Sequence, residues 1–384
     1  MGRRKKLPAG FTKRKDGILQ YAFTIDGSRY FVYAASVEEC EKKRDEIRDR
    51  LKQGLSLKDG TITLHDYYER WQARRVKSGQ VKPSTVYANN RRYARIDKIL
   101  GKKRLTAIKK DDVYQLQADL VKDLSSKGTN DTIALMKSIL KSAIDEDIIP
   151  KNPLDGVKSI KRTEEEAAKN THRYLSGDEI TAFFEAAAGS IYKNLFLFLL
   201  LSGMRCGEAG ALTWADIDEK NNVIHIAKSV TRISNKEFVI GSTKTQDSKR
   251  DIELTDELRN VLASQKIQQA GLFGIRAVRD EQQIFTTLSG GLINQSNTCP
   301  VIANICKKAG KAGHQIERFT PHAFRHTFIT YELENGVPMN DIARQVGHTN
   351  TITLQKYYSH EDPEKMKEAF RMVSRDMMKL VKIS

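Results

Sequence analysis

The sequence has no long apolar run. None of its stretches approaches the roughly 20 consecutive apolar residues that a membrane-spanning helix needs. Its basic start, MGRRKKLPAGFTKRKDG, is not followed by the apolar core of a secretory signal. We therefore expect a cytoplasmic protein with no membrane partner.

Cysteines are scarce, and no carboxylate cluster with the spacing of metal ligands is present. The four cysteines are scattered and form no C-x-x-C pair: Cys40, Cys206, Cys299 and Cys306. Such thiols are typical of a reducing compartment, and Cys206 is expected to pack in a core rather than to react. Without a zinc pattern or an Asp/Glu/His cluster, the sequence predicts no metal and no other cofactor.

Acidic residues are outnumbered by basic ones. The chain has 48 Asp and Glu against 65 Lys and Arg, which leaves a net charge of +17 at pH 7. An excess of this size favours a polyanionic partner, most simply nucleic acid. A basic surface can also serve solubility or bind anionic lipid, so the charge alone does not decide the partner.

A run of reactive side chains stands near the C-terminus, in PHAFRHTFITYELENGVPMNDIARQVGHTNTITLQKYYSH (residues 321–360). Pro321 can begin a helix, on which His322 and Arg325 are three positions apart and share a face. Gly336 is expected to end this helix. The helix would therefore carry an imidazole and a guanidinium on one side.

The second part of this run adds another imidazole and two phenols. Gly347 is expected to end a second helix, His348 follows it, and Tyr357 and Tyr358 close the run. Arginine binds phosphate with two parallel N–H donors, an imidazole passes protons near neutral pH, and a phenol amid positive charge is a usable nucleophile. These groups suit attack on a phosphodiester without a metal. A tyrosyl phosphate would keep the energy of the broken bond, so the strand could be rejoined without ATP.

The joint pattern of H-x-x-R, then G-H, then Tyr-Ser-His resembles the tyrosine recombinase (phage integrase) family. Within that family, the chain is most similar to the integrases of conjugative transposons and related integrative elements. The resemblance implies the DNA breaking–rejoining fold and strand exchange through a 3′-phosphotyrosyl intermediate. It also implies an upstream arginine and a lysine. Arg205 in SGMRCGEAG matches the family's Gly-x-Arg-x-x-Glu motif, and Lys244 in STKTQDSKRDIEL stands where the family has its hairpin lysine.

The resemblance assigns a role to each catalytic residue. Arg205 and Arg325 bind the scissile phosphate, and His348 donates a further hydrogen bond to a non-bridging oxygen. His322 assists proton movement at the nucleophile, and Lys244 protonates the leaving 5′ oxygen.

The nucleophile is one of two adjacent tyrosines. Tyr357 lies nine residues after His348 and Tyr358 lies ten, and members of the family use either spacing. The Tyr-Ser-His run favours Tyr358, with Tyr357 as the alternative.

The first of three expected domains covers residues 1–55. Alternating apolar residues before and after the Asp26-Gly27 turn predict an antiparallel sheet, and Ser36 can cap a helix behind it. Through the resemblance, this is an arm-type DNA-binding domain. Its predicted DNA contacts are Arg3, Arg4, Lys13 and Arg14.

The second expected domain covers residues 62–160 and is all-helical. Thr63 can cap its first helix, Ser84-Thr85 opens another, and 129–148 carries an apolar stripe. The resemblance makes it the core-binding (SAM-like) domain, and its predicted phosphate contacts are Arg91, Arg92 and Arg95. Residues 150–172, which have little apolar content, are expected to form a linker.

The third expected domain, residues 172–384, is the catalytic domain: mainly α-helical, with a small antiparallel sheet. The segments NVIHIAKSV, EFVIGST and KRDIEL alternate as three strands. Glu208 is assigned to structure rather than acid catalysis, and Lys249 and Arg250 are predicted as phosphate contacts. An amphipathic helix over 366–381 would pack on its own domain or on a neighbouring protomer.

The implied partners are double-stranded DNA, at crossover and arm-type sites, and further copies of the chain. Four protomers would exchange strands through a Holliday junction, linked by their C-terminal helices and aided by accessory DNA-bending or excision factors. Two alternatives remain open: a type IB topoisomerase-like enzyme, and an inactive DNA-binding regulator of the same fold. A metal-dependent nuclease is disfavoured, because no ligand cluster is evident.

Overall fold

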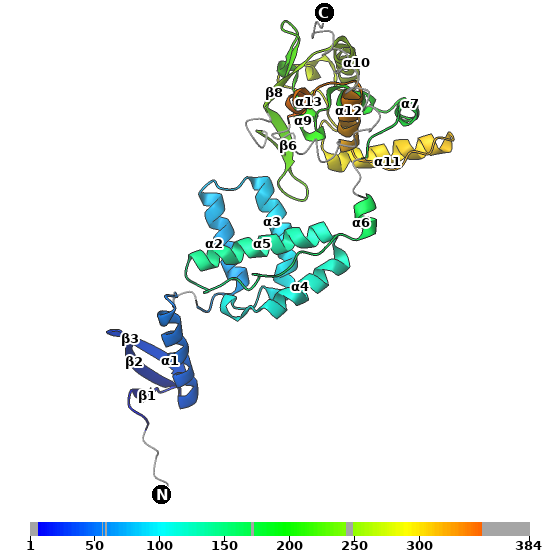
Figure 1. Ribbon diagram of the computed structural model, residues 1–384. Helices are drawn as coiled ribbons and strands as arrows, with labels where there is room; N and C mark the ends of the chain where they lie inside the picture. The colour runs from blue at the N-terminus through cyan, green and yellow to red at the C-terminus, as the bar shows by residue number, and fades with distance from the viewer. Residues whose placement is uncertain (1–6, 56, 58–59, 170–172, 243–248, 348–384) are drawn as a thin grey trace, which may run out of the picture. The chain divides into compact units, whose positions relative to one another are not determined.

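The protein is described by a computed structural model over residues 7–55, 57, 60–169, 173–242 and 249–347 (Figure 1). The chain divides into two compact units, Met1–Lys169 and Asn170–Ser384, and each unit has a large hydrophobic core of its own. Most of the described chain is helical, with small antiparallel sheets in both units. The predicted multidomain fold is confirmed.

The first unit starts with a three-stranded antiparallel sheet in the order β1 (Phe11–Lys13), β2 (Leu19–Ile25) and β3 (Ser28–Ala34). Its β2–β3 turn places Asp26 and Gly27 at positive φ, as the Asp-Gly pair predicted. Helix α1 (Val37–Lys52) packs on the sheet, and the Ser36 hydroxyl accepts a hydrogen bond from the Glu39 amide. The predicted N-cap is therefore confirmed.

The second hydrophobic core of this unit lies among four helices: α2 (Leu64–Lys77), α3 (Pro83–Leu100), α4 (Lys110–Asp123) and α5 (Ser126–Asp145). Thr63 caps α2 as predicted. Two helices begin earlier than predicted, by one residue for α3 and by three for α5. Helix α3 already begins at Pro83, whose missing N–H is tolerated in a first turn, and α5 begins three residues early because Ser125 caps it.

The segment predicted as a free linker, 150–172, is largely attached to the helical bundle. Asn130 on α5 exchanges two hydrogen bonds of 2.9 Å with the backbone of Ile160. The Ser126 amide donates to Glu166 on α6 (Glu164–Lys169) at 2.7 Å. The Asn130 side chain thus satisfies the backbone of Ile160, and the Glu166 carboxylate accepts from the start of α5. The low apolar content of the segment did not reveal these contacts. The prediction of a linker from residue 150 was wrong up to Glu166.

The second unit surrounds a buried helix, α8 (Lys193–Ser202), whose sequence KNLFLFLLLS is mostly apolar. Helices α10 (Asp256–Phe273) and α12 (His322–Glu334) pack against it, and α7 (Gly177–Ala186) packs against α11 (Gln295–Lys311). A cluster of phenylalanine rings fills the space between α7, α8 and α12: Phe183, Phe196 and Phe324.

The strands of this unit form two sheets. One has the order β4 (Ile217–Asp218), β5 (Val223–Ile226) and β8 (Arg250–Glu253), and the other pairs β6 (Lys228–Arg232) with β7 (Phe238–Ser242). The expected single strand NVIHIAKSV is therefore wrong. It breaks at Ala227, because its first half pairs with β8 and its second half pairs with β7.

Gly203 ends α8 in a conformation that only glycine adopts easily. Its φ is 60°, and a Cβ there would lie 2.5 Å from Phe328 Cδ1. We predict that Gly203→Ala lowers the free energy of unfolding by about 2–4 kcal/mol, from left-handed strain together with this overlap. Gly189, with φ of 77° and open space around it, is the matched control, and Gly189→Ala should cost only about 1 kcal/mol. Denaturant unfolding would contradict the prediction if the two variants lost equal stability.

Candidate active site

Arg205 stands where the chain passes from α8 into the short helix α9 (Cys206–Ala209). Glu208 Oε2 accepts a hydrogen bond from the Arg205 backbone N–H at 2.9 Å, and Oε1 accepts one from Nη1 at 2.8 Å. One carboxylate therefore holds both the main chain and the guanidinium. The Arg205 side chain still keeps 37% of its surface exposed, in contrast to the buried carboxylate that holds it.

Arg325 projects from the first turns of α12 and is only 1% exposed. Its Nη1 donates to the Gly203 carbonyl at 2.9 Å, and its Nη2 donates to the Val346 carbonyl at 2.6 Å. Arg325 thus joins the end of α8, next to Arg205, to the end of α13 (Met339–Val346).

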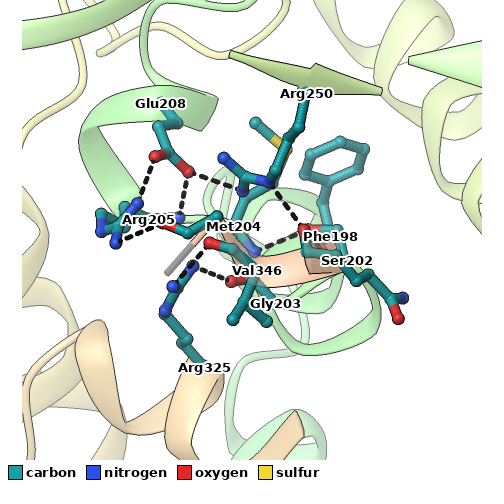
Figure 2. A network of polar contacts seen from close by, with 11 residues as sticks. Phe198, Ser202, Gly203, Met204, Arg205, Glu208, Arg250, Arg325 and Val346 are labelled. Carbon is teal, nitrogen blue, oxygen red and sulfur yellow. Dashed lines mark hydrogen bonds and ion pairs between the residues drawn. The ribbon is translucent and has the colours of Figure 1, made fainter. Parts of the chain in front are cut away.

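Three arginines bind three successive carbonyl groups at the end of α13, and Figure 2 shows one of these contacts, from Arg325 to Val346. Arg250 Nε donates to Gln345, Arg325 Nη2 donates to Val346, and Arg205 Nη2 donates to Gly347 at 3.3 Å. Cations are favourable at this end of a helix, where carbonyls lack partners within the helix. The two arginines predicted to bind the scissile phosphate therefore meet at one helix end. Gly347 has φ of 66° and ends α13, as predicted.

Glu208 and Arg250 form a buried ion pair beside Arg205. Arg250 Nη2 lies 3.0 Å from Glu208 Oε2, and the two side chains are 5% and 3% exposed. Although burial opposes it, Arg250 and Arg205 hold the pKa of Glu208 below its usual value. Glu208 is thus an anionic bridge between two guanidiniums, which agrees with its predicted structural assignment.

The placement of Arg250 differs from the expected surface phosphate contact, since its guanidinium points inward. A signal for this placement was present in the sequence. In the strand KRDIEL, Arg250 and Ile252 are two residues apart and so share one face, and Ile252 is buried. The strand alternation therefore predicts an inward side chain, whereas the charge alone had suggested an outward one.

His322 begins α12, one turn before Arg325. His322 is exposed, and its ring packs edge-on against the ring of His326 with 4.5 Å between the centroids. The predicted shared face thus presents an exposed imidazole near a buried guanidinium.

The other predicted site residues fall into three groups: those outside the described residues, those that are exposed and those that are partly covered. Six lie outside the described residues: Arg3, Arg4, Lys244, His348, Tyr357 and Tyr358. Four predicted DNA contacts are exposed: Lys13, Arg14, Arg91 and Lys249. Two are partly covered: Arg92, which pairs with Asp131 at 3.2 Å, and Arg95, which donates to the Arg91 carbonyl.

Cys206, next to Arg205, behaves as a packing residue. Burial raises the pKa of its thiol to about 11, and its Sγ lies 3.7 Å from Thr298 Oγ1. A thiol with this pKa is protonated at neutral pH and is a poor nucleophile.

The network concentrates positive charge around one carboxylate. Three guanidiniums and Glu208 leave two net positive charges at the end of α13. Such a site suits an anion that gains charge during a reaction, as a phosphate does in its pentavalent transition state. Among the described residues, no three His, Cys, Asp or Glu side chains gather so as to hold a metal ion. Of the described helices, none has the length and apolar character to cross a membrane.

Two family models match this chain, one in each compact unit. A family model described as "Phage integrase family" matches residues 173–365, and one described as "Phage integrase, N-terminal SAM-like domain" matches residues 63–121. A tyrosine recombinase XerC-like protein of Caldanaerobacter subterraneus is 27% identical over 356 residues, covering 88% of this chain and 89% of that protein. The transposase from transposon Tn916 of Enterococcus faecalis is 25% identical over 390 residues, covering 92% and 91%.

A solved structure shares the fold. The Tn1549 transposon integrase (residues 82–397), in complex with a circular intermediate DNA, superposes with a TM-score of 0.68 at 23% identity. The match covers 81% of this chain and 99% of that one.

Proposed function

The chain belongs to the phage integrase family of tyrosine-type site-specific recombinases, and we propose that it integrates or excises a mobile genetic element. It would cut and rejoin DNA through a 3′-phosphotyrosyl link. One observation carries the proposal: Arg205 and Arg325, 120 positions apart in the chain, bind adjacent carbonyls at the end of α13. The residue that follows this helix end in the sequence is His348, and the tyrosine pair comes soon after.

We assign the phosphate to the space beside Arg205. The Arg205 side chain is partly exposed, and its bond to the Gly347 carbonyl is longer than the Arg325 bond to Val346. Arg205 would therefore direct one N–H donor of its guanidinium at the scissile phosphate. The buried Arg325 would contribute positive charge next to it. His348 would donate to a non-bridging oxygen. Together these groups would stabilise the charge that accumulates in the transition state.

The reaction then exchanges one phosphodiester for another. The phenol oxygen of Tyr358 attacks phosphorus, the bond from phosphorus to the 5′ oxygen breaks, and Lys244 gives that oxygen a proton. His322 assists the removal of the tyrosine proton. In the second step, a 5′-hydroxyl of the partner duplex attacks the phosphotyrosine and releases the enzyme.

The three domains would divide the DNA contacts among them. Residues 1–55 would bind arm-type sites, residues 62–160 the crossover region, and residues 172–384 would carry out the chemistry. Four protomers would assemble through their C-terminal helices and pass through a Holliday junction, with accessory DNA-bending or excision factors setting the direction. Because the substrate is the DNA of a bacterial mobile element, the protein would act in the cytoplasm.

A nicked duplex that spans the junction between element and chromosome tests the proposal. The nick lets the short 5′-hydroxyl fragment diffuse away, so the protein should remain bound to the 3′ end. We expect a complex that withstands SDS, forms in EDTA without ATP, and yields a phosphotyrosyl peptide from residues 348–384. A DNA adduct on a 5′ end, or none with any junction sequence, would contradict it. A topoisomerase-like enzyme would instead relax supercoils without pairing two sites.

A further inference from the structure

Arg250 lies within the active-site network and bonds to two parts of it at once (Figure 2). Its Nη2 donates to Glu208 Oε2 at 3.0 Å, and its Nε donates to the Gln345 carbonyl at 2.6 Å. It is the first residue of β8, so a single buried cation links this strand to the carboxylate that holds Arg205 and to the end of α13.

We propose that Arg250 is a positioning residue for strand cleavage. It fixes Glu208, and through Glu208 the guanidinium of Arg205, and it sets the end of α13 against that guanidinium. Arg250 acts through these groups and not through a DNA phosphate. The inference rests on the function proposed above, because Arg205 has to bind the scissile phosphate for its position to matter.

The geometry of Glu208 explains why a second cation is needed. Both carboxylate oxygens are engaged by Arg205: Oε1 by Nη1 and Oε2 by the backbone N–H. Arg250 approaches Oε2 from β8, so the carboxylate is held from two elements. A carboxylate that is 3% exposed carries a large desolvation cost, and full pairing offsets it. Without Arg250, Glu208 would shift toward Arg205 and water, and Arg205 would shift with it.

Gly347 gives independent evidence that Arg250 sets the end of α13. A Cβ on Gly347 would lie 2.9 Å from Arg250 Nη1, and the residue has φ of 66°. The guanidinium is therefore in close contact with the last described residue before His348. A change in the Arg250 side chain would therefore disturb the backbone at the end of α13.

Single-turnover cleavage of the nicked junction duplex at saturating protein tests the proposal. Arg250→Gln should slow cleavage by about 10- to 100-fold, because a displacement of about 1 Å in a positioned group costs this much. Its DNA affinity and the salt dependence of binding should match the parent, since the salt slope counts phosphate contacts. The neighbouring Lys249 is exposed, and Lys249→Gln should lower that slope by about one.

A double-mutant cycle that combines Arg250→Gln with Glu208→Gln tests whether Arg250 affects cleavage through Glu208. If Arg250 acts through Glu208, the double variant should cleave about as fast as the slower single variant, and a multiplicative loss would overturn the proposal. A purely structural defect would lower the amplitude of cleavage, which reports the active fraction, and not the rate constant. An Arg250→Gln variant with the parent rate, or with a reduced salt slope, would also overturn it.

Two controls keep the outcome interpretable. If Arg250→Gln does not fold, Arg250→Lys replaces it. The lysine keeps the charge next to Glu208, but one ammonium cannot reproduce the forked contacts to Glu208 and Gln345. A folded Arg250→Lys variant should cleave about tenfold more slowly, and a parent rate would refute the positioning role. A parent protein that does not cleave refutes the proposed function instead.

Discussion

Tyr358→Phe should abolish the covalent complex between protein and DNA, whereas Tyr357→Phe should still form it. The phenol oxygen is the atom that attacks phosphorus, and phenylalanine lacks it, so no slower route through the same residue remains. The Tyr-Ser-His run favours Tyr358 as the source of this oxygen. SDS gels of the labelled nicked duplex measure the complex directly, and we expect no detectable adduct with Tyr358→Phe.

DNA binding provides the control for this pair of variants, because removing one hydroxyl should leave the affinity of both near that of the parent. The reverse pattern, with the adduct lost only in Tyr357→Phe, would make Tyr357 the nucleophile and leave the rest of the mechanism intact. An adduct in both single variants and in the double variant would refute tyrosine attack altogether.

Local interactions account for the features that the sequence predicted well. Ser36 caps α1 by accepting a hydrogen bond from the Glu39 amide, and Gly347 ends α13 in a left-handed conformation, both as expected. The partners of each such signal lie within four residues, so a short window of sequence contains them. The positions of Arg205 and His322 at helix starts follow from the same kind of signal.

Long-range pairing accounts for the features that local sequence patterns did not predict. Glu208 and Arg250 are 42 residues apart, and Arg205 and the Gly347 carbonyl are 142 apart. No helix or strand periodicity specifies such partners. Charge was also misleading for Arg250, because a basic residue usually faces water unless it is paired. Asn130 and Ser126 likewise bind residues of the predicted linker that lie 30 and 35 positions further along the chain.

Arg205→Lys should slow strand cleavage by about 10²–10³-fold, as the loss of one charge-stabilising donor does in other enzymes. The guanidinium of Arg205 already bonds to Glu208 and to the Gly347 carbonyl, and the proposed mechanism adds a phosphate oxygen. A lysine ammonium keeps the charge but lacks the planar fork, so it cannot hold Glu208 and present a second donor to the phosphate in the same geometry. Single-turnover cleavage at saturating protein isolates this loss from any change in DNA affinity.

Arg173 offers a matched control for this substitution within the same unit. Its side chain is 30% exposed, against 37% for Arg205, and it pairs with Glu179 in the first turn of a helix, as Arg205 pairs with Glu208. Arg173→Lys should therefore cost similar stability while leaving the cleavage rate within a fewfold of the parent. Equal cleavage by the two variants would mean that the loss at Arg205 reflects a weakened ion pair. A large loss confined to Arg205→Lys would place its guanidinium at the reacting phosphate.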